Sequence, residues 1–426
     1  MKNRINNFIM RTDCKSARAG ILALGLVILF FACEDYSGKY QMTGGVPTIT
    51  FIRYQDSNLS GRLLEGAEMG QAILIIGENL TSVQEVWFNN VKAILNISLI
   101  TKNTLFVTVP RDLPSERTDK IYFVTQKKDT VKYDFEVIIP KPSIDRMKCE
   151  FVPAGKEVVV YGDYFLATDF SKIKVFIGDY EVPTSDIISV EKTILKFKAP
   201  PMDIKGALEV RTLYGNSARS KDIFRDDRGM ITTFDDDYPI NPGWGRPDPS
   251  TFRDDPEYAL IGKYWRLSGA ISESNSGPWG QLDALCFHYW GEDNGKPTGN
   301  LFPSDPKTST LKFEVNVVQE WSALALIFFF HAQGTTNGPM WDNGYPCGLW
   351  KPWSTNTGVV PYKTDGWITV SMPLSGFNKD NQGGTGMLSQ DFPPAFGALT
   401  IVLYRGGVQG LACNPMILID NIRVVP

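Results

Sequence analysis

The chain has 426 residues, of which 43 are Lys or Arg and 47 are Asp or Glu, so its formal net charge is −4. Such a slightly acidic balance excludes a general electrostatic affinity for nucleic acid or anionic lipid. The length exceeds what one hydrophobic core usually covers, so we expect several domains.

The first segment of the chain has the pattern of a secretory signal. Five basic residues precede Gly20, and an apolar run of 12 residues from Ile21 to Ala32 ends at Cys33. A membrane-spanning helix needs about 20 apolar residues, so the run predicts a signal peptide over residues 1–32 rather than a span. Residues 33–45 then form a tether before the first domain.

The end of this leader carries further information. Ala32-Cys33 resembles the lipobox of bacterial lipoproteins, although Phe30 stands where Leu is usual. The resemblance implies that Cys33 is acylated, and Glu34 with Asp35 resembles the signal that exports lipoproteins to the outer face of the outer membrane. It therefore implies a surface-exposed protein anchored in the outer membrane by lipid. The alternative is an ordinary signal peptide that happens to contain a cysteine.

Of the six cysteines, Cys14 belongs to the leader and Cys33 ends it. The other four have no metal-binding spacing, because they stand far apart in the sequence: Cys149, Cys286, Cys347 and Cys413. Disulfides form outside the cytoplasm, and Cys347 with Cys413 is a conceivable pair. Free buried thiols are the alternative.

An internal repeat organises the first half of the chain. The run Ile73–Leu80 is echoed by Val158–Phe165, and Thr101–Pro110 is echoed by Glu191–Pro200. Short Val/Ile/Phe/Thr runs separated by Gly, Asn and Pro predict antiparallel sandwich strands. The order of a strand ending in Gly, a V-x-F strand and a strand ending in Pro resembles the IPT/TIG immunoglobulin-like fold. We expect two such domains, over residues 46–139 and 140–225, that act as spacers.

Residues 226–426 predict a third domain, again a β-sandwich, so the whole chain is expected to be all-β. The segments Gly366–Ser375 and Ile417–Val424 resemble the late strands of β-jelly-roll carbohydrate-binding modules. That resemblance implies a structural calcium ion held by Asp235 and Asp420. Surface carboxylates at strand ends explain the two residues equally well, and no cofactor is expected to be required.

Tryptophan is concentrated in this third domain, where nine of the chain's ten lie between Trp244 and Trp367. The stretch from Gly334 to Pro361 places three of them among Gly, Pro, Asn, Thr and Ser, which predicts loop. Aromatic plates with amides and little charge suit a neutral glycan, because an apolar sugar face stacks on a ring. The predicted glycan-binding residues are Trp279, Trp290, Trp341, Asp342, Asn343, Tyr345, Trp350 and Trp353. We expect Trp265, Trp321 and Trp367 to pack in the core or on a sheet.

Two IPT/TIG-like modules and a jelly-roll behind a lipid anchor resemble the surface glycan-binding proteins of bacterial polysaccharide-utilisation systems. The resemblance implies a non-catalytic protein that captures a neutral β-linked polysaccharide and holds it near a surface endo-glycanase and a TonB-dependent transporter. A β-glucan is the first expectation, followed by xyloglucan and mannan.

Two other classes stay open. A secreted glycoside hydrolase or lyase needs paired carboxylates across the scissile bond, and the chain has no E-x-D-x-x-E motif. Glu314 and Glu320 are the nearest glutamate pair in this domain, and we expect both to be solvated strand positions. A protein-binding adhesin would be favoured if no glycan bound.

Overall fold

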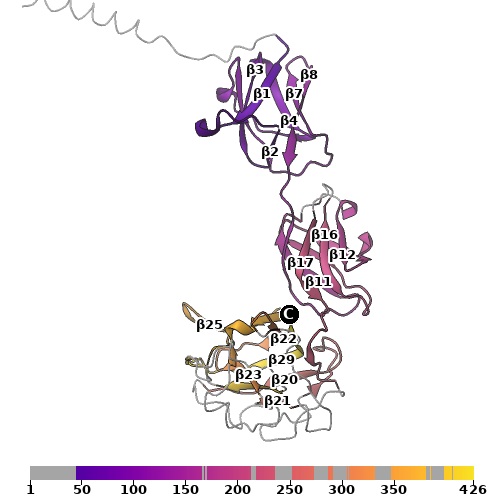
Figure 1. Ribbon diagram of the computed structural model, residues 1–426, viewed down its shortest axis with the longest axis vertical. Helices are drawn as coiled ribbons and strands as arrows, with labels where there is room; N and C mark the ends of the chain where they lie inside the picture. Colours follow the sequence, from indigo (N-terminus) through magenta and orange to yellow (C-terminus); the bar gives the residue numbers. More distant parts are fainter. Residues whose placement is uncertain are drawn as a thin grey trace, which may run out of the picture. The chain divides into compact units, whose positions relative to one another are not determined.

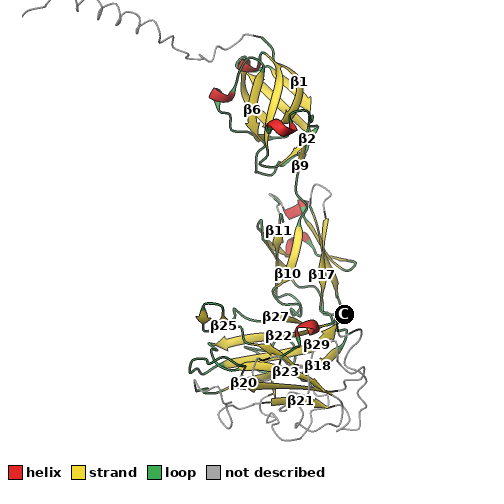
Figure 2. Ribbon diagram, turned by 60° about the vertical axis from the view of Figure 1, so that its left-hand side comes forward, coloured by secondary structure: helices red, strands yellow, loops and turns green. Residues whose placement is uncertain are grey.

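The computed structural model describes residues 45–165, 167, 170–212, 217–235, 252–272, 286–290, 305, 307–331, 347–379, 384, 398–404 and 406–426. Strands dominate these residues, and the helical segments among them are short 3-10 turns (Figure 2). No helix in this described part is both long and apolar enough to cross a membrane. The chain forms two compact units, one ending at Ile139 and the other beginning at Pro140.

The first unit contains a β-sandwich (Figure 1). One sheet consists of β1 (Thr48–Tyr54), β3 (Ala72–Glu78) and β6 (Thr104–Thr108), in that order. The other runs in the order β5 (Val91–Lys92), β4 (Val83–Phe88), β7 (Lys120–Thr125) and β8 (Thr130–Asp134), and a parallel pair joins β2 (Gly66–Glu68) to β9 (Glu136–Ile138). Alternate residues such as Ile73, Ile75, Val86 and Phe88 are buried between the sheets, as period-two patterning requires.

The second unit begins with another sandwich of the same kind. Its sheets run β10 (Ser143–Met147), β11 (Glu157–Asp163), β15 (Ile194–Lys198), β14 (Ile187–Val190), and β13 (Tyr180–Glu181), β12 (Lys174–Ile177), β16 (Gly206–Arg211), β17 (Ser217–Phe224). A separate core of Val158, Val160, Leu195 and Phe197, among others, fills it. The fold of this half is therefore the tandem immunoglobulin-like arrangement that the repeat predicts.

A glycine at the same point of each repeat explains why the repeated strand ends in Gly. A Cβ on Gly77 would lie 2.0 Å from the carbonyl oxygen of Thr48, and one on Gly162 would lie 1.9 Å from that of Ser143. In both sandwiches the register of the first strand pair shifts beside this contact. Since only glycine allows such a close approach, the motif is a packing requirement.

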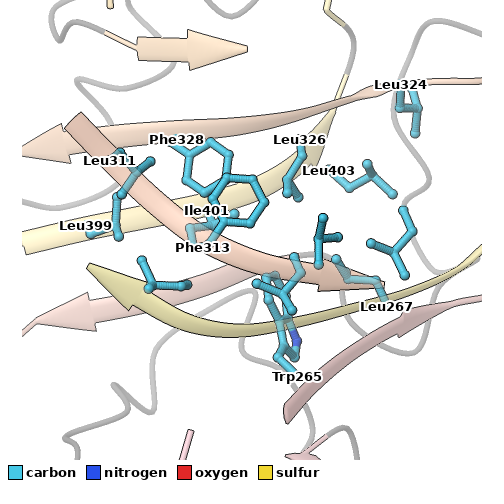
Figure 3. Packing of buried hydrophobic residues seen from close by; sticks show 14 of the residues in the cluster. Trp265, Leu267, Leu311, Phe313, Leu324, Leu326, Phe328, Leu399, Ile401 and Leu403 are labelled. Carbon is cyan, nitrogen blue, oxygen red and sulfur yellow. The ribbon is translucent and has the colours of Figure 1, made fainter. Parts of the chain in front are cut away.

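The C-terminal domain is a larger sandwich. One sheet runs β19 (Phe252–Arg253), β20 (Tyr264–Ser268), β29 (Met416–Val425), β22 (Thr310–Gln319), β27 (Ile368–Pro373), with β18 (Met230–Thr232) also paired to β29. The second sheet runs β21 (Cys286–Trp290), β28 (Ala398–Tyr404), β23 (Ala325–His331), β24 (Cys347–Trp350), and a small hairpin joins β25 (Ser354–Thr355) to β26 (Gly358–Val359). Figure 3 shows side chains from both sheets meeting in the core, where the rings of Phe313 and Phe328 are 5.0 Å apart.

Two tryptophans that the sequence analysis expected to pack in the core or on a sheet lie in this core. Trp265 and Trp321 are fully buried, and the indole of Trp321 donates to the carbonyl of Ala323. Burying a large apolar side chain contributes about 1.5–3 kcal/mol, so each helps to hold the two sheets together.

The possible disulfide is not formed. Cys347 is buried, and its thiol donates to the carbonyl of Lys379 at 2.8 Å. Cys413 pairs through its backbone with Ile271 and makes no disulfide. The structure therefore supports the alternative, in which Cys347 and Cys413 are free thiols.

Candidate functional site

Five of the eight predicted glycan-binding residues lie outside the described residues: Trp279, Trp341, Asp342, Asn343 and Tyr345. The other three are Trp290, at the end of β21, and Trp350 and Trp353 around β24.

Trp353 is a core residue. Its side chain is fully buried, and its indole nitrogen donates to the carbonyl of Leu324 at 2.8 Å. A ring enclosed in this way has no face to offer a sugar, so the interpretation of Trp353 as a ligand contact is corrected. The turn residues around it had suggested exposure, but here the loop aromatic clamps its loop onto the sandwich.

Trp350 is half-buried at the edge of the sandwich. Its ring packs 5.4 Å from that of Trp321 and 5.5 Å from that of Phe313, so one side faces the core. The indole also lines a cavity of about 380 Å³ between the edge strands β24 and β27, with Met372 and Phe377. The geometry therefore leaves Trp350 reachable from this edge crevice.

Two lysines belong to the same crevice. Lys351 donates to the carbonyl of Gly406, and burial, with Lys379 nearby, lowers the pKa of its ammonium group. Both lysines offer donors to hydroxyl oxygens. The crevice thus combines an aromatic wall with hydrogen-bond donors.

Trp290 is placed by strand register. β21 pairs with β28 so that Trp290 is opposite Ala398, and β23 pairs with β28 so that His331 is also opposite Ala398. Directly opposed residues share a face of the sheet. One row across three strands therefore contains positions 290, 398 and 331, with a small residue between two ring-bearing ones.

This row lies on the face of the sheet opposite the main core. Ile327, Phe329 and Val402 share that face and are buried in a cluster of their own, whereas their strand neighbours Phe328 and Ile401 belong to the main core. The middle of the face is therefore filled, and the row of Trp290, Ala398 and His331 lies toward one end of it. We call this row the aromatic row. The alternation of residues along each strand would have predicted the aromatic row if the pairing of β21 and β23 with β28 had been known.

The residues assigned to calcium have other partners. The carboxylate of Asp235 accepts from the Lys263 amide and the Thr233 hydroxyl, each at 2.9 Å. Asp420 is fully buried, and burial raises the pKa of its carboxyl well above the ordinary 3.8. One oxygen of Asp420 has no hydrogen-bond partner, but within the described ranges no three His, Cys, Asp or Glu side chains gather around it or elsewhere as a metal site. Because calcium also takes carbonyl and water oxygens as ligands, the ion that the resemblance implies at Asp235 and Asp420 stays a prediction.

A buried network of charges joins the C-terminal domain to the second sandwich. Arg423 of β29 is fully buried, and its guanidinium donates to Glu314 of β22 at 2.8 Å and to Glu150 of the second sandwich at 2.7 Å. Lys312 contacts Glu150 at 2.7 Å and Asp222 at 2.5 Å. We call these five residues the buried charge network.

The network corrects the expectation for Glu314, which is not a solvated position. Burial raises the pKa of its carboxyl, and Arg423 opposes that rise. Burial also disfavours the charged form of Arg423, but Glu314 and Glu150 together raise the pKa of the guanidinium above its ordinary value. Because Glu314 is enclosed and paired, it is not available for acid–base work on a glycan, while Glu320 is exposed at the end of the strand. No sequence pattern signals this pairing, since its members are up to 273 residues apart.

Comparison with known proteins finds two matching family models and a similar solved structure. The family model for the surface glycan-binding protein B xyloglucan binding domain matches residues 224–426, and the IPT/TIG domain model matches residues 142–223. The surface glycan-binding protein PbSGBP-B from Prevotella bryantii is 31% identical, over 90% of this chain and 99% of that one, with a TM-score of 0.67. The chain belongs to the surface glycan-binding protein B family.

Two further relatives of this family member are more distant. An SGBP-B from a complex xyloglucan utilization locus in Bacteroides uniformis is 19% identical, over 89% of this chain and 99% of that one, with a TM-score of 0.46. An IPT/TIG domain-containing protein of Bacteroides ovatus is 24% identical over 162 residues, which are 37% of this chain. The match spans 33% of that relative, about a third of its length.

Proposed function

We propose that the C-terminal domain of this surface glycan-binding protein captures xyloglucan at the aromatic row. The observation that carries the proposal is that strand register brings Trp290 and His331 to either side of Ala398 on one sheet face. Neighbouring strands are about 4.8 Å apart, so the two ring-bearing positions are about 10 Å apart, a spacing that lets one glycan chain meet both.

The choice of xyloglucan rests on the matched domain. The family model that covers residues 224–426 is described as a xyloglucan binding domain. Xyloglucan is also the kind of ligand that the residues favour, because it is neutral and has a β-linked glucan backbone with apolar sugar faces. Other β-glucans and mannan, which the sequence also allows, become comparison ligands.

The protein acts in this proposal as a non-catalytic capture protein. Glu314 and Asp420 oppose each other in register, but both are fully buried, so they do not form an open carboxylate pair across a glycosidic bond. Lipid on Cys33 would hold the protein at the outer membrane, where bound polysaccharide is presented to a surface endo-glycanase and a TonB-dependent transporter. The two immunoglobulin-like sandwiches, residues 46–139 and 140–225, serve as spacers in this arrangement.

Affinity electrophoresis of the mature chain through xyloglucan-containing gels tests the site. We expect Trp290→Ala to lower the affinity for xyloglucan by about tenfold, because loss of a stacking ring removes about 0.5–1.5 kcal/mol beyond its area burial. Trp87→Ala is the matched control, since Trp87 lies in the first sandwich and its indole donates to Glu85. Unchanged retardation of a folded Trp290→Ala variant would contradict the placement of the site.

A further inference from the structure

A second cavity lies between the second sandwich and the C-terminal domain, which belong to the same compact unit. Its volume is about 270 Å³, and we call it the junction pocket. The second sandwich and the C-terminal domain both supply its walls, including Lys148, Val152, Val159, Leu260, Asp365 and Trp367. The aromatic row contributes nothing to these walls, so the pocket is a separate feature.

The inner surface of the junction pocket is apolar and carries one oriented ring. Val152, Val159 and Leu260 are each less than a tenth exposed. Trp367 is half-buried, its indole nitrogen donates to the Tyr258 carbonyl at 2.7 Å, and its ring meets Tyr264 edge-on at 6.1 Å. Because these contacts already fix the ring, stacking a ligand on it costs little further conformational entropy.

The rim of the junction pocket is polar but has no net charge. Lys148 pairs with Asp365 at 3.0 Å, and Lys156 and Glu157 are exposed beside them. Two cations and two carboxylates cancel, so the rim gives no preference for a phosphate or another anion. It does supply ammonium donors and carboxylate acceptors, which are the groups that bind sugar hydroxyls.

The two walls of the junction pocket are held in a fixed relation. The Thr369 amide donates to the Lys148 carbonyl at 2.9 Å, and the Glu150 amide donates to the Thr369 hydroxyl at 2.8 Å. The buried charge network lies next to these bonds through Glu150. The pocket is therefore formed before any ligand arrives, as is usual for small-molecule sites.

We propose that the junction pocket is a second glycan site, which takes one neutral pyranose unit against Trp367. Its volume is just below the roughly 300–1,000 Å³ of pockets for drug-sized ligands, so it suits a single ring or a branch rather than a long chain. The proposal rests on the proposed function in one respect, because the pyranose is taken to belong to the same polysaccharide. A chain bound at both sites would gain affinity from their linkage.

The test uses the mature full-length chain with 5-fluorotryptophan in place of tryptophan, and a xylogluco-oligosaccharide as the probe. The Trp367→Phe variant identifies the fluorine resonance of residue 367 by its loss. We expect that resonance to shift on addition of the oligosaccharide, in the wild type and equally in the Trp290→Ala variant. A resonance that stays in place at saturating oligosaccharide overturns the proposal.

Calorimetry with xyloglucan supplies a second readout. We expect Trp367→Leu to weaken binding by about two- to tenfold and Trp367→Phe, which keeps a ring, to weaken it less. Asp365→Ala changes a fully exposed side chain, so it tests the rim even if Trp367→Leu fails to fold. Wild-type affinity in the folded Trp367→Leu and Asp365→Ala variants, with weakened binding in Trp290→Ala, would overturn the junction pocket and leave the proposed function intact. Complete loss of xyloglucan binding in Trp367→Leu, with wild-type affinity in Trp290→Ala, would support the junction pocket and overturn the aromatic row as the capture site.

Discussion

Replacing Arg423 with methionine should strongly destabilise the C-terminal domain. The guanidinium makes four hydrogen bonds, two to Glu314, one to Glu150 and one to the carbonyl of Asn421. Without it, the fully buried Glu314 keeps, among the described residues, only the hydroxyl of Thr369 as a side-chain partner, at 2.8 Å. Removing one member of a buried ion pair costs about 3–5 kcal/mol, because the other charge is left uncompensated.

The same variant should show a pH dependence of known sign. Burial raises the folded-state pKa of Glu314, and loss of Arg423 removes the charge that opposes the rise. A carboxyl with a raised folded pKa contributes stability that is present below its unfolded pKa and is lost as the pH rises through the folded value. Arg423→Met should therefore be less destabilised at pH 5 than at pH 8.

Urea unfolding followed by tryptophan fluorescence is the appropriate assay, since nine of the ten tryptophans lie in the C-terminal domain. Arg253→Met is the matched control in the same domain, because Arg253 makes a largely exposed ion pair with Asp255 that contributes about 1 kcal/mol or less. The double variant Arg423→Met/Glu314→Met should regain much of the loss, since no unpaired charge then remains on Glu314. A loss below about 1 kcal/mol in Arg423→Met would refute the reasoning.

Three further outcomes are expected. Gly77→Ala should lower the unfolding free energy of the first sandwich by more than about 1 kcal/mol, whereas Gly61→Ala, at a position with open space around it, should change it by less than about 0.5 kcal/mol. Equal urea midpoints for the two variants would show that the contact of Gly77 with the Thr48 carbonyl does not require glycine. Trp353→Ala should cost about 3–5 kcal/mol as a large-to-small core change, while glycan affinity measured by calorimetry on the folded fraction stays at the wild-type value. Asp420→Asn should gain stability relative to the wild type as the pH rises from 5 to 8, because the raised pKa of Asp420 makes its charged form costly when buried. Melting experiments at the two pH values measure this, and a loss of stability of the same size at both would show that the carboxylate itself is needed.

The fold was largely predictable because its signals are local. The repeated Gly77 and Gly162 mark the same strand contact in two sandwiches, and alternating residues such as Ile73 and Ile75 mark a buried face. These patterns depend on neighbours along the strand, so they can be recognised without knowing the tertiary structure.

The site was less predictable because exposure depends on the tertiary structure. Trp350 and Trp353 lie in the same kind of sequence, three residues apart, yet one lines a cavity and the other is enclosed by the core. Trp367 resembled an ordinary sheet residue, and its place in the junction pocket depends on Lys148 and Leu260 from distant segments. Glu314 likewise looked solvated because its charge partner, Arg423, is 109 positions away in the sequence.

The proposed capture of glycan is tested most directly by calorimetry of the mature chain with xyloglucan, alongside mannan and starch as comparison polysaccharides. The account predicts saturable heat with xyloglucan and little or none with mannan and starch, and no rise in reducing ends during the titration. A folded protein that gives no heat with xyloglucan, or that releases reducing ends from it, would contradict the account.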